Sequence, residues 1–409
     1  MNALKKISIT DLSIFALACV ALQLPVYHLY ISLTIGAWIL LSFTAAIVQR
    51  NPPRLNFGTA LMMVFYVLIS LGKLWSDNKG LAGFDMEVKM SFVILPFVMM
   101  FVRYERKHLK FLLYTFLLGL IVGCASLLTE AYLDYRNTNA LAEFFYVELS
   151  RRVHPSYYSY YLNIAISLLL VDYITESLGM FRRKGLYLIL IAGFSIFSLL
   201  LVSKNGIIIS ILLLLILLVF WIVKRKIILV VLTVTAMLGT SYFVYIKSSN
   251  MQARIDEMMR GLSSEENENA ERYSTGIRIA IWKEAVYLIK ESPIIGYGPG
   301  DVTDALIDRY DKKGLTIALV RRLNAHNQFL QTTLSIGIVG LSILFAILLY
   351  PFFLKKKNKW FAIGLVLITI AFFATESVLE TQAGVISFVL FYSLLVSVEW
   401  NNEPKIEEY

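Results

Sequence analysis

Charged residues are scarce in this sequence of 409 residues, and cysteine is nearly absent. Asp, Glu, Lys and Arg make up only 16% of the chain, whereas 58% of the residues are hydrophobic. The core of one water-soluble domain could not bury so much apolar side chain, which excludes a soluble protein of this length. The two cysteines, Cys19 and Cys124, both lie in apolar runs. They predict neither a disulfide framework nor a metal site.

The sequence instead contains many long apolar runs. A helix needs about 20 residues to cross roughly 30 Å of hydrocarbon, and runs of that order, with charges mostly at their ends, recur about twelve times. They cover residues 12–27, 29–48, 57–74, 84–102, 109–131, 157–173, 186–202, 206–223, 227–246, 329–354, 361–375 and 383–398. The pattern predicts an all-α polytopic membrane protein with about 12 transmembrane helices.

Lysine and arginine gather in alternate short connections, which predicts the orientation. The clusters are Lys5 with Lys6, Arg50 with Arg54, 103–110, 182–184, 224–226 and 355–359. Because such clusters are retained in the cytoplasm, both termini are predicted to be cytoplasmic and residues 134–156 and 247–325 to lie outside. The chain then divides into nine helices (1–246), a large helical loop (247–327), and three helices with a short tail (328–409). The net charge of +9 reflects this topology and does not favour a nucleic-acid partner.

Lys89 is a charge inside the apolar run 84–102, with Glu87 two residues before it. A charge at such a depth costs about 2.5 to 3.5 kcal/mol unless it reaches water or a partner. Snorkelling of the side chain toward the outer face and pairing with a buried partner are both open interpretations.

The first outer segment ends in Arg151, Arg152 and His154, directly before Pro155. Proline favours a helix start, so these side chains are predicted at a helix N-terminus, where unpaired N–H groups and the helix dipole favour an anion. A rim of solvated charges is the structural alternative. A row of tyrosines favours the site, because flat faces and hydroxyls suit sugars: Tyr157, Tyr158, Tyr160 and Tyr161.

Ser203-Lys204-Asn205 is a very short outer connection between two long apolar runs. A cation on so short a tether stays at the membrane surface. Lys204 is therefore predicted to stay near the membrane and not to extend into bulk water.

The long outer segment alternates between helix and turn. Residues 251–262 and 275–290 have helical spacing, with an acidic stretch at 263–271 between them. The second helix is predicted to bury Ile279, Trp282, Val286 and Ile289. A glycine-rich turn at 293–300 follows, which can cradle phosphate but is more often only a turn.

Charged residues then lead toward the next membrane run. Arg321 and Arg322 make that approach strongly basic. Asp301, Asp304 and Asp308 leave metal binding open, although their neighbours Arg309, Lys312 and Lys313 are natural ion-pair partners on a helix.

His326 and Asn327 stand where this polar segment meets the apolar run 329–354. A histidine has an ordinary pKa near 6.5, so it could take a proton from a hydroxyl at neutral pH. Its structural alternative is a histidine that merely caps the loop together with Asn327. Nine residues separate this pair from Gly337-x-x-Gly340. With Arg278, Trp282 and the turn at 293–300 upstream, the spacing resembles the O-antigen ligase and O-antigen polymerase superfamily.

The resemblance implies a glycosyltransferase of the bacterial inner membrane that acts at the periplasmic face. The reaction it implies is metal-independent and inverting, uses no cofactor, and moves a glycan from undecaprenyl pyrophosphate to lipid A-core. His326 matches the proposed base and Arg278 a ligand of the diphosphate, while Lys204 stands where the family usually has arginine. The residues themselves add basic side chains suited to a pyrophosphate leaving group. The candidate substrate contacts are Lys204, Arg151, Arg152, His154, Arg321, Arg322 and Asn327.

Other functions remain open from the sequence. The single compact outer loop before His326 favours a ligase over a polymerase that joins repeat units. An O-linked protein glycosyltransferase of the same superfamily usually has a larger outer C-terminal region than the tail 401–409. A lipid-linked glycan transporter would predict broken helices in two related halves, and no such internal repeat is evident.

Overall fold

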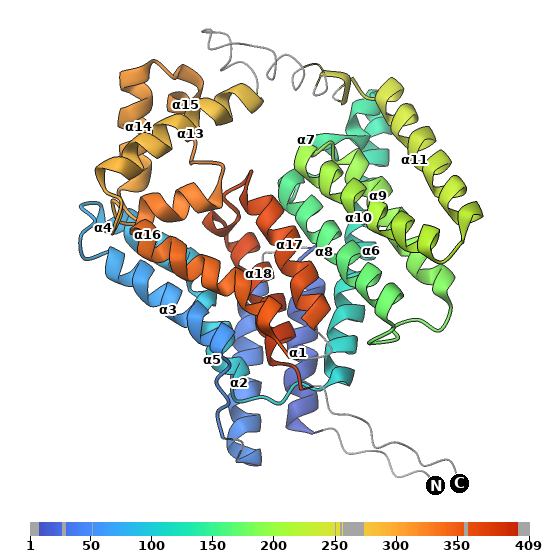
Figure 1. Cartoon of the computed structure of the whole chain (residues 1–409), viewed down its shortest axis with the longest axis horizontal. Coiled ribbons are helices and arrows are strands. Elements are labelled where there is room, and N and C mark those ends of the chain that lie inside the picture. Colours follow the sequence, from blue (N-terminus) through green and yellow to red (C-terminus); the bar gives the residue numbers. More distant parts are fainter. Residues whose placement is uncertain are drawn as a thin grey trace.

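The computed structural model describes residues 8–26, 30–50, 52–249, 251–253, 256, 274–355 and 359–399. Lys5, Lys6, His28, the acidic stretch 263–271, most of the helix predicted over 251–262, and the tail 401–409 lie outside these residues. In the part described, every regular element is a helix (Figure 1). The elements are α1 (Ile9–Gln23), α2 (Ile31–Gln49), α3 (Phe57–Gly72), α4 (Lys79–Lys89), α5 (Ser91–Met99), α6 (Arg106–Thr138), η1 (Leu141–Phe144), α7 (Tyr146–Leu149), α8 (Pro155–Thr175), α9 (Lys184–Leu200), α10 (Lys204–Val223), α11 (Ile227–Lys247), α13 (Ser274–Glu291), α14 (Val302–Lys313), α15 (Thr316–Val320), α16 (Gln328–Leu349), η3 (Tyr350–Phe353), α17 (Lys359–Phe373), η4 (Val378–Glu380) and α18 (Gln382–Ser397).

Most of the helices follow the predicted apolar runs, but the run 84–102 is divided at Met90 between α4 and α5, and α6 extends beyond the predicted 109–131 to Thr138. Within the described residues, five helical segments are long and apolar enough to cross a membrane: Ile31–Gln49, Arg106–Thr138, Lys204–Val223, Ile227–Lys247 and Gln328–Phe353. Five further apolar helices are shorter: α1, α3, α9, α17 and α18. The all-helical class is confirmed, whereas the number of membrane crossings stays a prediction.

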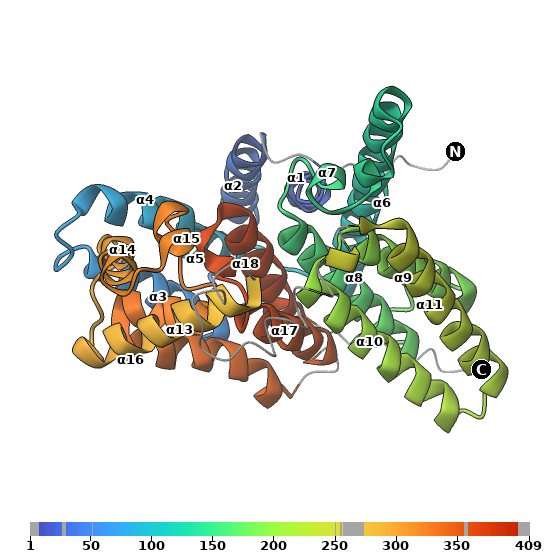
Figure 2. The ribbon, with the colours of Figure 1, turned by 90° about the horizontal axis from the view of Figure 1, so that it is seen from above.

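The helices α8, α17 and α18 form the centre of the bundle. α17 packs against both α8 and α18, and α8 also contacts α9 and α10. On the other side, α3 contacts α5 and α16 (Figures 1 and 2). Almost every side chain of α8 and α18 is buried, so these two helices contact protein on all sides.

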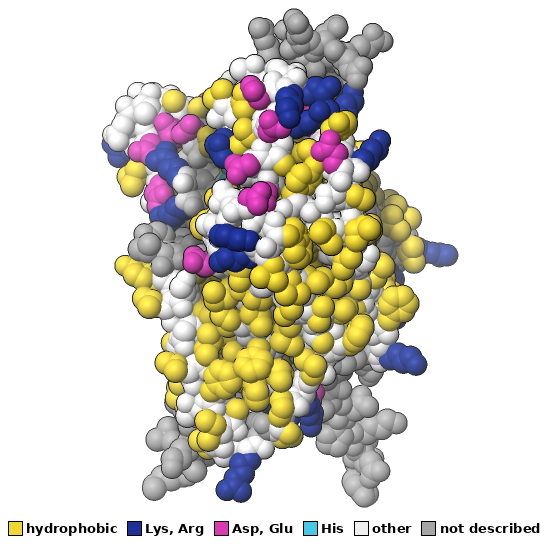
Figure 3. All heavy atoms as spheres, turned by 90° about the vertical axis from the view of Figure 1, so that its left-hand side faces the viewer, with side chains coloured by type: hydrophobic (Ala, Val, Ile, Leu, Met, Phe, Trp, Pro, Cys, Tyr) yellow, Lys and Arg dark blue, Asp and Glu magenta, His cyan; other side chains and the backbone are white. Residues whose placement is uncertain are grey.

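The outside of the bundle is apolar where a soluble protein would be polar. Large hydrophobic side chains such as Leu33, Leu40 and Ile228 are more than two-thirds exposed. Figure 3 shows a continuous apolar band on one face, with the charged side chains gathered mainly above it. Such a belt suits a hydrocarbon environment, in agreement with a membrane protein.

Helices α13, α14 and α15 form a smaller body at one end of the bundle (Figure 1, top). It has its own core, which includes Ile281, Leu306 and Tyr310. The buried face of α13 consists of Ile277, Ile281, Ala285 and Leu288, while Ile279 and Val286 are exposed. The buried face of α13 is therefore rotated by about a third of a turn from the predicted one. Trp282 and Ile289 are partly buried against the same core, because α13 packs on both α14 and α16.

The glycine-rich turn at 293–300 lies between α13 and α14 and contacts α16, which is broken at Ile336 and Gly337. The break frees two carbonyl groups, which accept hydrogen bonds from the N–H groups of Tyr297 (2.8 Å, Leu334 O) and Gly298 (2.9 Å, Ser335 O). Gly337 has φ +64°, and a Cβ there would lie 1.9 Å from the carbonyl oxygen of Ile294. The Gly-x-x-Gly pattern thus fits a backbone contact. Two of the turn's N–H groups are used in that contact, which favours the plain-turn interpretation over a phosphate cradle.

Candidate functional site

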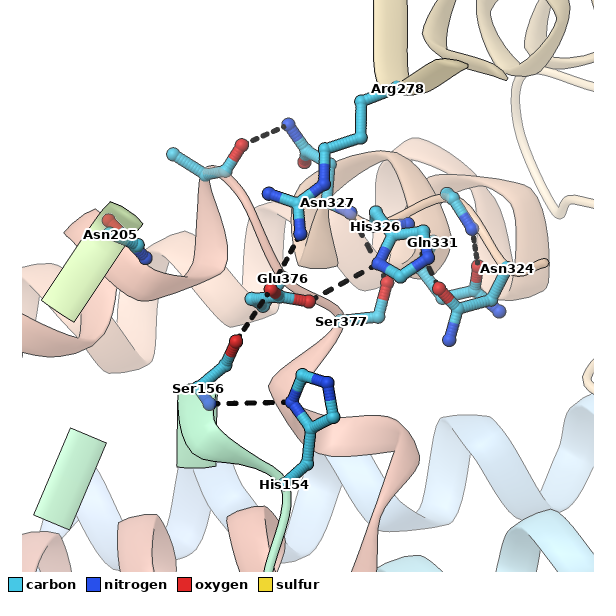
Figure 4. A network of polar contacts seen from close by, with 12 residues as sticks. His154, Ser156, Asn205, Arg278, Asn324, His326, Asn327, Gln331, Glu376 and Ser377 are labelled. Carbon is cyan, nitrogen blue, oxygen red and sulfur yellow. Dashed lines mark hydrogen bonds and ion pairs between the residues drawn. The ribbon is translucent and has the colours of Figure 1, made fainter. Parts of the chain in front are cut away.

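Glu376, in the turn between α17 and η4, is the centre of a polar network (Figure 4). Its Oε1 accepts hydrogen bonds from Arg278 Nη2 at 2.7 Å and from Ser156 Oγ at 3.1 Å. Its Oε2 lies 3.2 Å from His326 Nδ1. Residues from α8, α13 and the start of α16 therefore meet on one carboxylate. Neither motif nor spacing in the sequence marked Glu376 or Ser156.

The backbone around His326 fixes its ring against this carboxylate. His326 has φ +43°, a left-handed conformation that is uncommon outside glycine. Its N–H donates to Asn324 Oδ1 at 3.0 Å. A strained conformation of this kind persists only where neighbouring contacts hold it.

Asn327 supplies several of those contacts. Its Oδ1 caps α16 by accepting from the N–H groups of Phe329 (3.0 Å) and Leu330 (3.1 Å). Its Nδ2 donates to Ala374 O at 3.0 Å, and its backbone N–H donates to Ser377 Oγ at 3.2 Å. Asn327 thus ties the start of α16 to the turn that carries Glu376. These contacts support a positioning role for this side chain, and its contact with substrate stays a prediction.

The electrostatics keep Glu376 ionised. Burial opposes the charged form, but the hydrogen bond with His326 and the charges of Arg278 and His326 outweigh it and lower the pKa of Glu376 to about 2. A carboxylate beside Nδ1 favours the tautomer that carries its proton there, so that Nε2 is left as the proton acceptor. The His326 side chain is 27% exposed, which gives the ring access to a substrate.

Arg278 lies on the first turns of α13, above the carboxylate in Figure 4. Its side chain is 29% exposed. A guanidinium has five N–H donors, and the contact with Glu376 uses one nitrogen. Arg278 can therefore bind Glu376 and still present N–H groups to an anionic substrate.

His154 reaches the same network from the opposite side of Glu376 (Figure 4). It is the N-cap of α8, and its Nδ1 accepts the backbone N–H of Ser156 at 3.3 Å. Lys204 is the first residue of α10, and its neighbour Asn205 lies at the edge of the network, where Nδ2 is 3.5 Å from Ala371 O. The structure thus brings His154 and the start of α10 near His326.

Arg151 and Arg152 point away from the network. Arg151 forms ion pairs with Asp134 and with Glu143, the latter at 2.7 Å. Arg152 pairs with Glu130 and donates to Ser126 Oγ at 3.1 Å. Both arginines are about one-third exposed and contact the end of α6. Their role as anion ligands remains a prediction. The ion pairs that they form with carboxylates do not favour that role.

The remaining predicted charges are also placed elsewhere. Arg321 and Arg322 are exposed in the turn after α15, and Arg322 lies 3.4 Å from Asp304. Asp308 pairs with Lys312 at 2.6 Å. The Asp301 carboxylate accepts the N–H groups of 77 and 78 at 2.7 and 2.8 Å, which anchors α14 to the connection between α3 and α4. Each aspartate therefore has a different protein partner.

The tyrosine row of α8 is not a sugar surface. Tyr158, Tyr160 and Tyr161 are at most 1% exposed. Tyr160 OH bonds to Thr369 Oγ1 at 2.8 Å, and Tyr161 OH donates to Ala383 O at 3.2 Å. The prediction that these faces meet sugars is wrong for the three residues, because α8 is a central helix of the bundle.

The fold and the site together define a class of protein. It is an all-helical membrane protein with a histidine, a carboxylate and an arginine in contact at one end of its bundle. Residues 186–345 match the family model described as O-antigen ligase. Residues 186–345 are therefore similar to the O-antigen ligase family, in agreement with the resemblance drawn from the motifs. The matched region includes Lys204, Arg278 and His326, whereas His154, Ser156 and Glu376 lie outside it.

One relative in sequence is an uncharacterized protein of Haemophilus influenzae. It is 25% identical over 131 residues, which cover 32% of this chain and 33% of that protein. The match thus spans about a third of either chain.

Proposed function

We propose that this protein is an O-antigen ligase, a glycosyltransferase that moves a glycan from undecaprenyl pyrophosphate to lipid A-core. The observation that carries the proposal is the contact of His326 and Arg278 with one ionised carboxylate, Glu376. This arrangement joins a base to a cation that can hold a departing phosphate. In the proposed orientation both termini are cytoplasmic and the site faces the periplasm of the bacterial inner membrane.

The base in this proposal is His326. Its Nε2 takes the proton from the acceptor hydroxyl as the hydroxyl oxygen attacks the anomeric carbon. The bond from that carbon to the pyrophosphate oxygen breaks, the electron pair leaves with the diphosphate, and the configuration inverts. Glu376 orients the ring and stabilises the imidazolium that forms, as the carboxylate of a catalytic triad does.

The leaving group needs positive charge. Arg278 offers its remaining N–H groups, and Lys204 offers a point charge at the start of α10. The N-termini of α8 and α10 add the positive ends of two helix dipoles near the network. In this proposal these groups stabilise the developing charge without a metal ion or cofactor. Transfer by the purified protein should then be unchanged by EDTA, and activity that is lost to the chelator and restored by Mg²⁺ or Mn²⁺ would contradict it.

The decisive experiment is the lipopolysaccharide pattern of a deletion strain complemented with wild type or with a His326→Ala variant. Loss of all glycan caps on lipid A-core in the deletion and in the variant strain supports a ligase. Caps of a single repeat unit would instead indicate a polymerase. An unchanged pattern in the deletion strain would exclude both, and accumulation of the donor on the cytoplasmic side would indicate a transporter.

A further inference from the structure

A second polar cluster lies beside the site and is built around a buried lysine. Lys89, at the end of α4, is 4% exposed and forms ion pairs with Asp85 and with Glu380, whose carboxylate is 3.1 Å away. Of the two interpretations that the sequence left open, the structure supports pairing with buried partners over snorkelling toward water. Glu380 also accepts a hydrogen bond from Gln328 Nε2 at 3.3 Å, and Gln328 is 1% exposed. Neither Lys89 nor Glu380 belongs to the reaction described above.

The cluster holds the same turn that presents Glu376. Glu376 and Glu380 are four residues apart, and between them the N–H of Leu379 donates to Gln328 Oε1 at 2.7 Å. Gln328 follows His326 by two residues. The turn is thus fixed at one end by the site and at the other by Lys89 and Gln328.

We infer that Lys89 is a positioning residue for the transfer reaction. The ion pair between Lys89 and Glu380 fixes the turn 376–380. This turn then places the Glu376 carboxylate against His326. The inference rests on the proposed function for its effect on rate, but the coupling of Lys89 to His326 is a structural property that can be measured separately. A displacement of about 1 Å at a reacting group can reduce a rate by about a hundredfold, so such support matters to the chemistry.

The alternative is that Lys89 only neutralises buried carboxylates and so stabilises the fold. Breaking a buried ion pair usually destabilises a protein, whatever its role. A loss of stability in a Lys89 variant would therefore not distinguish the two roles. The distinction requires a measurement at His326 itself.

The experiment uses the full-length protein in detergent and the variants Lys89→Met, Glu380→Gln and Glu376→Gln. Asp85→Asn is the matched control, because Asp85 also contacts Lys89 but lies on α4 and outside the turn. Diethyl pyrocarbonate labels accessible imidazoles, and peptide mass spectrometry reads its rate at His326 separately from the other histidines. The initial rate of glycan transfer is measured on the same samples.

A positioning role predicts that Lys89→Met changes the labelling rate of His326 severalfold and in the same direction as Glu376→Gln, with a smaller change in Asp85→Asn. It also predicts a fall in kcat of about ten- to hundredfold. That loss should largely disappear when Lys89→Met is added to Glu376→Gln, since both changes act on one contact.

An unchanged labelling rate at His326 in folded Lys89→Met would overturn the inference, as would losses in kcat that multiply in the double variant. If Lys89→Met does not elute as a folded protein, Glu380→Gln decides by the same criteria. If the wild type transfers no glycan, the proposed function fails, while the labelling comparison still tests the coupling.

Discussion

Glu376 and Glu380 occupy one short turn, yet their surroundings differ. Glu376 contacts His326 and Arg278, whose side chains are 27% and 29% exposed. Glu380 contacts Lys89, whose side chain is 5% exposed. One carboxylate therefore faces groups that a substrate can reach, and the other faces a cation sealed inside the bundle.

The difference shows how one turn can serve both chemistry and support. Buried charge is expensive in a membrane protein and is retained mainly where it has a function. Here the carboxylate that contacts the buried Lys89 lies four residues from the carboxylate that contacts His326 and Arg278, on the same backbone segment. The following changes test whether the two carboxylates differ as their partners suggest.

The largest effect is expected from His326→Ala, which removes the reacting partner of Glu376. Loss of a general base typically lowers a rate by about 10²- to 10⁴-fold. The ring is partly exposed, so the variant should fold and insert normally. Transfer from purified lipid-linked donor is the measurement, with membrane level and elution profile as controls. Wild-type transfer by a well-expressed variant would contradict the assignment of His326.

Glu376→Gln should have the second-largest effect. Its kcat should fall about 10²-fold or more, because the amide can no longer stabilise the imidazolium. Glu380→Gln keeps the shape of the side chain in the same turn and is the matched control. Its loss should be clearly smaller, since it acts only through position. Equal losses in the two variants, measured as kcat with saturating donor, would mean that Glu376 has no direct part in the proton transfer.

Sequence alone predicted much of the fold and one half of this site. The apolar runs gave the helices, and the spacing among Arg278, His326 and Gly337 gave the arginine and the histidine. Glu376 carried no signal, because a single glutamate in a short polar connection has no fixed spacing to either partner. Its role arises only when Asn327 ties α16 to that turn, a contact between segments 47 residues apart in sequence.

The sequence did not reveal contacts between distant segments. The ion pairs of Arg151 with Asp134 and of Arg152 with Glu130 depend on how the long helix α6 packs beside residues 151–152. The tyrosines of α8 were predicted to be accessible because a sequence does not show which helix is central. Both cases concern neighbours distant in sequence, which periodicity does not reveal.

Arg278→Lys should have a smaller effect than loss of the base, but it should not be conservative. Lysine keeps the charge and loses the planar fork that can bind Glu376 and a phosphate together. Hydrogen bonds between charged groups contribute about 1.5 to 3 kcal/mol, so a loss of roughly ten- to hundredfold is expected. Lys204→Arg, which adds the fork, should by the same reasoning be tolerated or more active. Equal transfer rates for wild type and Arg278→Lys would place Arg278 among the structural charges.

The smallest effect concerns stability and its dependence on pH. The pKa of Glu376 is lowered from an ordinary 4.5 to about 2 in the folded protein. A carboxyl whose pKa is lower in the folded state stabilises the fold fully above its unfolded pKa, and the contribution is lost as the pH falls toward its folded pKa.

Wild type should therefore melt at a higher temperature than Glu376→Gln at pH 7, and the difference should be at least as large at pH 5.5, because the carboxylate also stabilises a protonated His326. It should begin to narrow only below about pH 4.5, where the unfolded chain takes up the proton. Thermal unfolding in detergent between pH 7 and pH 3 measures it, with Glu380→Gln run in parallel. If the difference in melting temperature already closes between pH 7 and pH 5.5, Glu376 is not held as a carboxylate by His326 and Arg278. His326 would then lack the negative charge that orients its ring.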